Sequence, residues 1–164
     1  MKRIEGKVWR FGNDINTDLI TPGPYMSLPL EEMLQHLFEP VDRKFAKEVR
    51  KGDVIVAGRN FGCGSSRESA PAALKAVGIS AVIAESFARI FFRNAVSIGL
   101  PPVICKDVST HFRTGDRCSL DLKRLEVKNL STGKTLTAEP LPPILFDILK
   151  RGGLLDLLKE VEER

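Results

Sequence analysis

The stretch that decides the fold spans residues 54–68 and reads Val54-Ile55-Val56-Ala57-Gly58-Arg59-Asn60-Phe61-Gly62-Cys63-Gly64-Ser65-Ser66-Arg67-Glu68. Its first four residues are apolar and predict a short buried strand. The alanine-rich residues 69–77, ended by Gly78, predict a helix. A glycine-rich turn therefore joins a strand to a helix N-terminus, where unpaired backbone N–H groups and the helix dipole favour an anion.

The side chains of this turn add chemistry to the glycines. Ser65 and Ser66 place two hydroxyls at the expected helix start, and Arg67 adds a guanidinium suited to bidentate binding of a carboxylate. A structural interpretation stands beside this one, because Ser65 and Glu68 have the spacing of a capping box. Capping explains only those two residues, so we expect a structural and an anion-binding role in the same turn.

The flanking sequence predicts an α/β fold. Apolar runs at 81–84 and 102–105 predict two more strands, and residues 87–98, with Ser86 as the cap, predict the helix between them. Strands that alternate with helices indicate a parallel βαβ core with right-handed crossovers.

Outside this core, shorter elements are expected. Residues 7–10 predict an opening strand, residues 12–24 a polar loop and residues 30–38 an amphipathic helix, followed by a short helical piece at 45–49. Segments 117–121, 124–129 and 134–137 predict additional antiparallel strands, and segments 143–149 and 154–161 predict two C-terminal helices. We find no repeat or linker and expect a single domain over residues 1–164.

Composition excludes several classes of function. The formal charge is +4, but acidic residues are interspersed, and one Trp and one Tyr give little for nucleic-acid stacking, so no nucleic acid is expected as a partner. No apolar run approaches the roughly 20 residues that span a bilayer and no signal peptide is visible, so we expect no membrane contact and a cytoplasmic location. The three cysteines, Cys63, Cys105 and Cys118, are too scattered to suggest a disulfide framework or a metal site in this chain alone.

Three blocks in this order resemble a known family: residues 14–22, 58–70 and 84–94, which begin at Asp14, Gly58 and Ala84. They are similar to the signature of the mobile domain of aconitase-type hydro-lyases. Their spacing and the chain length resemble the stand-alone small subunits of the 3-isopropylmalate dehydratase (isopropylmalate isomerase) family, over about residues 6–158. The resemblance implies an aconitase-type swivelling β/β/α domain. It also implies reversible dehydration and rehydration that interconverts 2-isopropylmalate and 3-isopropylmalate in leucine biosynthesis.

The resemblance also assigns roles to residues. Ser65 corresponds to the family's serine general base, which acts as an alkoxide. Arg67 corresponds to its carboxylate-binding arginine, with Ser66 and the amides near Gly62 and Gly64 assisting. Supporting positions are expected at Thr17, Asp18, Asn60, Arg89 and Arg93. His36 and His111 lie outside the matched blocks, and no base for Ser65 is evident in this chain.

A loop of Tyr25, Met26, Ser27 and Leu28 corresponds to the segment that distinguishes substrates in the family. Residues 21–40 contain no Arg or Lys, so an alkyl substituent is favoured over a third carboxylate, unless a partner or Arg59 supplies the cation.

The resemblance implies a partner, since the family's [4Fe–4S] cluster is held by cysteines of a large subunit. We expect activity only with that subunit, in a heterodimer or a heterotetramer, and no cluster bound by this chain alone. Small subunits of homoaconitase, dimethylmalate dehydratase and maleate or citraconate hydratase have similar blocks and remain alternatives. A non-catalytic anion-binding module is a further alternative.

Overall fold

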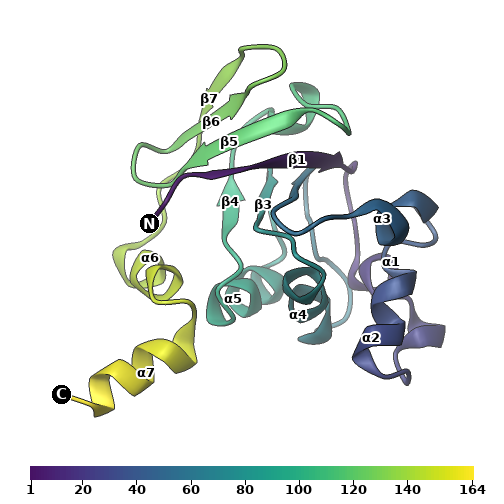
Figure 1. The fold of residues 1–164 in the computed structure, drawn as a ribbon, viewed down its shortest axis with the longest axis horizontal. Coiled ribbons are helices and arrows are strands. Elements are labelled where there is room, and N and C mark those ends of the chain that lie inside the picture. Colours follow the sequence, from purple (N-terminus) through teal and green to yellow (C-terminus); the bar gives the residue numbers. More distant parts are fainter.

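The fold is built on one mixed sheet of seven strands in the order β4-β3-β2-β1-β5-β6-β7 (Figure 1). The computed structural model describes residues 1–164. The strands are β1 (Ile4–Arg10), β2 (Val54–Ala57), β3 (Ala81–Ala84), β4 (Pro102–Ile104), β5 (Arg117–Asp121), β6 (Glu126–Asn129) and β7 (Thr135–Thr137).

Strands β1 to β4 run parallel and form the buried half of the sheet. All residues of β2 and β3 are buried, as expected for a parallel sheet covered on both faces. Alternate residues serve two cores, because successive side chains of a strand point to opposite faces. Ile55 and Val82 pack under the helices, whereas Val54 and Ile83 pack in a second cluster with residues of β5 and β6.

Strand β1 joins the two halves. It pairs in parallel with β2, with Val8 opposite Val54, and antiparallel with β5, with Ile4 opposite Leu120. The ribbon of β5, β6 and β7 thus extends the sheet beyond β1, as Figure 1 shows. The predicted α/β fold, with a parallel core, added antiparallel strands and C-terminal helices, is confirmed.

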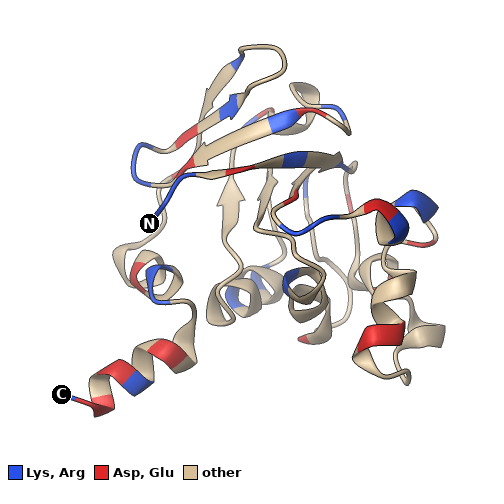
Figure 2. Ribbon diagram, in the orientation of Figure 1, with Lys and Arg blue, Asp and Glu red and all other residues tan.

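The helices are short. They are α1 (Thr17–Ile20), α2 (Leu30–Met33), α3 (Arg43–Glu48), α4 (Ser69–Ala76), α5 (Arg89–Ser97), α6 (Pro143–Lys150) and α7 (Leu154–Glu162), with 3-10 turns η1 (Gly23–Tyr25), η2 (Leu34–His36) and η3 (Val108–Thr110). None of them combines the length and apolar character needed to cross a bilayer. Figure 2 shows basic and acidic residues interspersed over strands and helices.

Two predicted helix caps are wrong. Glu68 occupies the N-cap of α4 and makes no side-chain capping bond, so Ser65 and Glu68 do not form a capping box. Helix α5 begins at Arg89 after an uncapped Ala88, because the Ser86 hydroxyl accepts a hydrogen bond from the Asn60 N–H at 2.8 Å instead. The Ser65 hydroxyl lies near Thr17, and the Ser86 hydroxyl is bonded to Asn60. Both expected caps therefore contact residues distant in sequence.

The segment between β1 and β2 also differs from prediction. Residues 12–24 contain α1, whose N-cap Asn16 accepts from the Leu19 N–H at 2.9 Å, and the following turn η1. The expected helix over 30–38 is divided into α2 and η2, and it ends early because the chain leaves helical geometry at Leu37.

Candidate active site

The glycine-rich turn is held against the loop that follows β1. The Asp14 N–H donates to the Arg59 carbonyl at 2.8 Å, the Gly62 N–H to Ile15 at 2.7 Å and the Thr17 N–H to Cys63 at 2.8 Å. We call these two paired segments, residues 12–17 and 58–65, the ledge. It lies after the carboxyl ends of β1 and β2, the edge where ligands bind in open α/β sheets.

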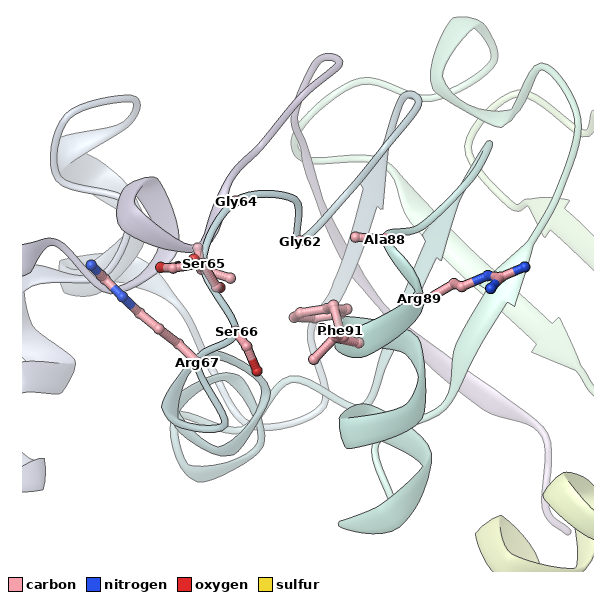
Figure 3. Close-up of a pocket in the computed structure, with 10 residues that line it drawn as sticks. Gly62, Gly64, Ser65, Ser66, Arg67, Ala88, Arg89 and Phe91 are labelled. Atoms are coloured by element: carbon pink, nitrogen blue, oxygen red, sulfur yellow. Dashed lines mark hydrogen bonds between the residues drawn. The ribbon is translucent and has the colours of Figure 1, made fainter.

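A hollow of about 320 Å³ opens between the ledge and the start of α5 (Figure 3). It brings together seven of the residues singled out from the sequence: Thr17, Gly62, Gly64, Ser65, Ser66, Arg67 and Arg89. Sequence reasoning missed Ala88, Ile90 and Phe91, which also line it. They lie in the matched block 84–94, so that block was the available signal.

The close approach of α5 explains why the turn needs glycine. Gly62 has φ +82°, and a Cβ at this position would lie closer than 3.0 Å to the side chain of Phe91. Phe91 is 2% exposed and packs on Phe61 at a centroid distance of 5.1 Å, edge to face. The turn therefore lies directly on the aromatic core beneath it.

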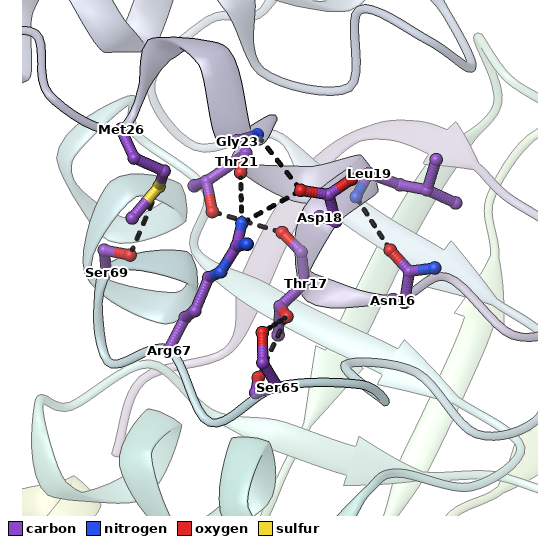
Figure 4. A network of polar contacts seen from close by, with 10 residues as sticks. All are labelled: Asn16, Thr17, Asp18, Leu19, Thr21, Gly23, Met26, Ser65, Arg67 and Ser69. Carbon is purple, nitrogen blue, oxygen red and sulfur yellow. Dashed lines mark hydrogen bonds and ion pairs between the residues drawn. The ribbon is translucent and has the colours of Figure 1, made fainter.

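Ser65 is exposed, and its hydroxyl points toward α1 (Figure 4). The buried Thr17 donates its hydroxyl to the Ser65 carbonyl at 2.9 Å, and the two hydroxyl oxygens lie 3.4 Å apart. A hydroxyl has one proton, so Thr17 in this geometry can only accept from the Ser65 hydroxyl. The contact therefore favours the neutral form of Ser65.

Arg67 is anchored on α1 through a single nitrogen. Its Nη1 donates to Asp18 Oδ1 at 3.2 Å and to the Thr21 carbonyl at 2.9 Å (Figure 4). Its Nε and Nη2 make no hydrogen bond within the chain. A guanidinium fixed along one edge keeps donors on the other edge for a carboxylate.

The remaining predicted residues take different places. Ser66 points toward Phe91 across the hollow, whereas the Arg89 side chain is turned away from it (Figure 3). Asn60 connects the ledge internally, with its side-chain amide donating to Asp14 at 3.2 Å. Arg93 does not line the hollow.

The predicted specificity loop lies beside the turn and does not line the hollow. Met26 and Leu28 pack against the main core, and the Ser69 hydroxyl contacts the Met26 sulfur at 3.9 Å. Tyr25 donates its hydroxyl to Glu39 at 2.9 Å and stacks on His36 with 3.7 Å between ring centroids.

Glu39 also meets His36 Nδ1 at 2.6 Å. These hydrogen bonds, first that of His36 and then that of Tyr25, hold the pKa of Glu39 below its ordinary value. The bond to Glu39 raises the pKa of Tyr25. We call Tyr25, His36 and Glu39 the staple of the specificity loop.

The cysteines of this chain do not fit an iron–sulfur cluster. Burial raises the pKa of Cys105 to about 11 and that of Cys118 to about 12, so both thiols stay protonated. Burial also raises the pKa of the half-buried Cys63. No three His, Cys, Asp or Glu side chains come together as a metal site, and a cluster requires thiolates in one arrangement.

Comparisons with known proteins agree with the family resemblance of the sequence. Residues 30–107 match the family model of the aconitase C-terminal domain. The chain is 52% identical to the 3-isopropylmalate dehydratase small subunit 1 of Methanopyrus kandleri, over 95% of this chain and 92% of that protein. It is 49% identical to the methanogen homoaconitase small subunit of Methanothermobacter thermautotrophicus, over 93% of this chain and 89% of that protein.

A solved structure also matches over almost the whole chain. The crystal structure of 3-isopropylmalate dehydratase (leuD) from Methanocaldococcus jannaschii superposes with a TM-score of 0.92 at 44% identity. The match covers 98% of this chain and 96% of that one.

Proposed function

This chain belongs to the 3-isopropylmalate dehydratase small-subunit family, and we propose that it is the small subunit of a hydro-lyase that interconverts 2-isopropylmalate and 3-isopropylmalate in leucine biosynthesis. The observation that carries the proposal is a turn that lines an open hollow and directs an exposed serine and an arginine to the same side, toward α1. We place the enzyme in the cytoplasm.

In this proposal, Arg67 binds a carboxylate of the substrate. Its Nη1 is held by Asp18 and Thr21, so the free Nε and Nη2 face a ligand with little loss of side-chain entropy. The Ser66 hydroxyl points to the other side of the turn, toward Phe91, and offers a donor within the hollow.

Ser65 removes the proton next to that carboxylate. It must first pass its own proton to a base outside this chain, since none is evident within it, and the Thr17 contact does not favour that loss in the isolated chain. A partner that closes the hollow excludes water, and the positive charge of Arg67 then favours an anion at Ser65 more strongly. In this proposal closure is therefore needed for the base, so the chain is active only with a partner.

The partner in this proposal is the large subunit, in a heterodimer or a heterotetramer. When bound there, its [4Fe–4S] cluster supplies the Lewis acid for departure of the hydroxyl group. No three His, Cys, Asp or Glu side chains come together in this chain, so in this proposal the ligands of the cluster come from the other chain.

Identity alone does not select the substrate, because a homoaconitase small subunit is 49% identical. In this proposal the specificity loop, residues 25–28, distinguishes between the two substrates. A third carboxylate would meet no Arg or Lys in residues 21–40. An alkyl substituent suits Met26 and Leu28 better.

The test is reconstitution with the large subunit and assay of isopropylmalate, homocitrate-series and methylated malates side by side. We expect Ser65→Ala to lower kcat by at least about a hundredfold, the range of general acid–base catalysis. Ser97→Ala, at the far end of α5, is the matched control with unchanged kcat. Circular dichroism and large-subunit binding should stay unchanged in both variants. Full turnover by Ser65→Ala would remove this residue from the mechanism.

A further inference from the structure

A second polar surface begins at the Arg59 end of the ledge. Three adjoining hollows of about 340, 450 and 700 Å³ share walls. The first two share Arg10, and the last two share Arg113 and Phe112. We call this continuous surface, with cations at Arg10, Arg59, Arg113 and Lys134, the basic groove.

None of the four cations of the basic groove forms an ion pair within this chain. No carboxylate oxygen lies within 4.0 Å of any of these four side chains. Two carboxylates line the groove, and both already accept hydrogen bonds. Glu85 accepts from the Ser109 hydroxyl at 2.9 Å, and Asp116 accepts from the Asn129 side-chain amide at 2.9 Å.

The lining indicates the chemistry of the occupant. Phe112 is 3% exposed and His111 is the one other ring in the lining, so the groove offers little stacking area for single-stranded nucleic acid. The almost complete lack of apolar lining also excludes an apolar helix or an alkyl ligand. An elongated polar surface with unpaired cations fits an acidic segment of a protein.

The position of the groove identifies that protein. Arg59 and Ser65 belong to one ledge, which backbone bonds at Asp14, Ile15 and Thr17 hold together. A chain that closes over Ser65 therefore lies next to Arg59. We propose that the basic groove docks an acidic segment of the large subunit, beside the hollow that this subunit completes; the inference rests on the proposed function.

Such a surface acts mainly on the rate of association. Its side chains are exposed at Arg10, Arg59, Arg113 and Lys134. Exposed charges are screened over about 10 Å at 0.1 M salt and add little to affinity. They steer the encounter of two proteins and raise the association rate at low salt.

The experiment measures association of the purified large subunit with this chain by interferometry over a salt series. The test variant is Arg113→Glu/Lys134→Glu, which leaves the ledge unchanged. The matched control is Lys123→Glu/Arg124→Glu, which changes the net charge equally. It lies beyond Asp121, at the end of β5 remote from Arg117 and the groove.

We expect the test variant to associate about tenfold more slowly at low salt, with a flatter salt dependence, while the control behaves as wild type. The kcat of the complex at saturating large subunit should be unchanged. Equal association rates for test variant and control would overturn the inference. So would an RNA oligonucleotide that binds wild type and loses affinity for the test variant while large-subunit association stays unchanged. Failure of the wild-type chain to bind the large subunit would instead overturn the proposed function itself, and this inference with it.

Discussion

At the scale of single residues, Gly62 sets the distance between the turn and α5. It lies in the left-handed region, and its Cα faces the Phe91 side chain. Two hydrogen bonds also join the turn to the segment around α1. Thr17 donates to the Ser65 carbonyl, and Arg67 donates to the Thr21 carbonyl.

We expect Gly62→Ala to lower the free energy of unfolding by about 1–3 kcal/mol, because overpacking and a strained φ act together. Activity of the reconstituted enzyme should fall as well, because the turn must shift. Gly12→Ala is the control, since no atom lies within 4 Å of the added methyl group and φ is not positive. Urea denaturation followed by the fluorescence of the single Trp, Trp9, measures both variants. Equal stability of the two variants would contradict the packing argument.

At the scale of elements, the staple connects η1 with η2 and the residues after it. The lowered pKa of Glu39 means that folding favours its charged form, so this stabilisation is present above pH 4.5 and is lost as the pH falls through the lowered pKa. The raised pKa of Tyr25 adds a loss on the alkaline side, above pH 10.0. Arg43 is the other charged group acting on both.

We expect Tyr25→Phe and Glu39→Gln to speed hydrogen exchange of residues 22–28 severalfold at pH 6, after correction for intrinsic rates. As the pH falls through the lowered pKa of Glu39, wild type should come to exchange like Glu39→Gln, because the carboxylate becomes protonated. Ser27→Ala, in the same loop, should exchange like wild type throughout this pH series. A wild-type loop whose corrected exchange ignores pH would show that the staple does not hold it.

Elements also show how far sequence reasoning reaches. The apolar runs that became β2 and β3 were predicted with the observed bounds, because full burial needs only a local pattern. The helix start at Ser69 was predicted correctly. Its cap, and the cap and start of the helix that begins at Arg89, were wrong, because Ser65 and Ser86 contact Thr17 and Asn60, which are distant in sequence. Helix α1 had a readable signal in its Asn16 cap and the acidic Asp18 in its first turn.

Sequence reasoning likewise located only part of the candidate site. The blocks located the hollow, since a glycine-rich turn at a strand end is a local feature. The partners of Arg67 at Asp18 and Thr21, and the staple formed by His36 and Glu39, depend on tertiary contacts that no local pattern reveals.

At the scale of the whole molecule, the sheet separates the three thiols. Cys118 and Cys105 are fully buried in the core beneath the antiparallel ribbon, whereas Cys63 lies on the ledge with partial exposure. With pKa values of about 12 and about 11, the two buried thiols carry almost no thiolate at pH 8.

We therefore expect Ellman's reagent at pH 8 to modify Cys63 alone in the folded chain, and all three thiols after denaturation. Cys63→Ala should leave the folded protein without a fast-reacting thiol. Rapid modification of three thiols in the native protein would contradict the buried placement of Cys105 and Cys118.

The position of β1 at the centre of the sheet has a consequence for biosynthesis. This strand emerges first from the ribosome, yet its neighbours β2 and β5 begin only at Val54 and Arg117. The two edges of β1 stay unpaired until these residues are synthesised, and closing such long loops is slow. The nascent chain thus passes through a period in which a central strand is open to wrong partners, so chaperones that shield it during translation should raise the yield of folded subunit.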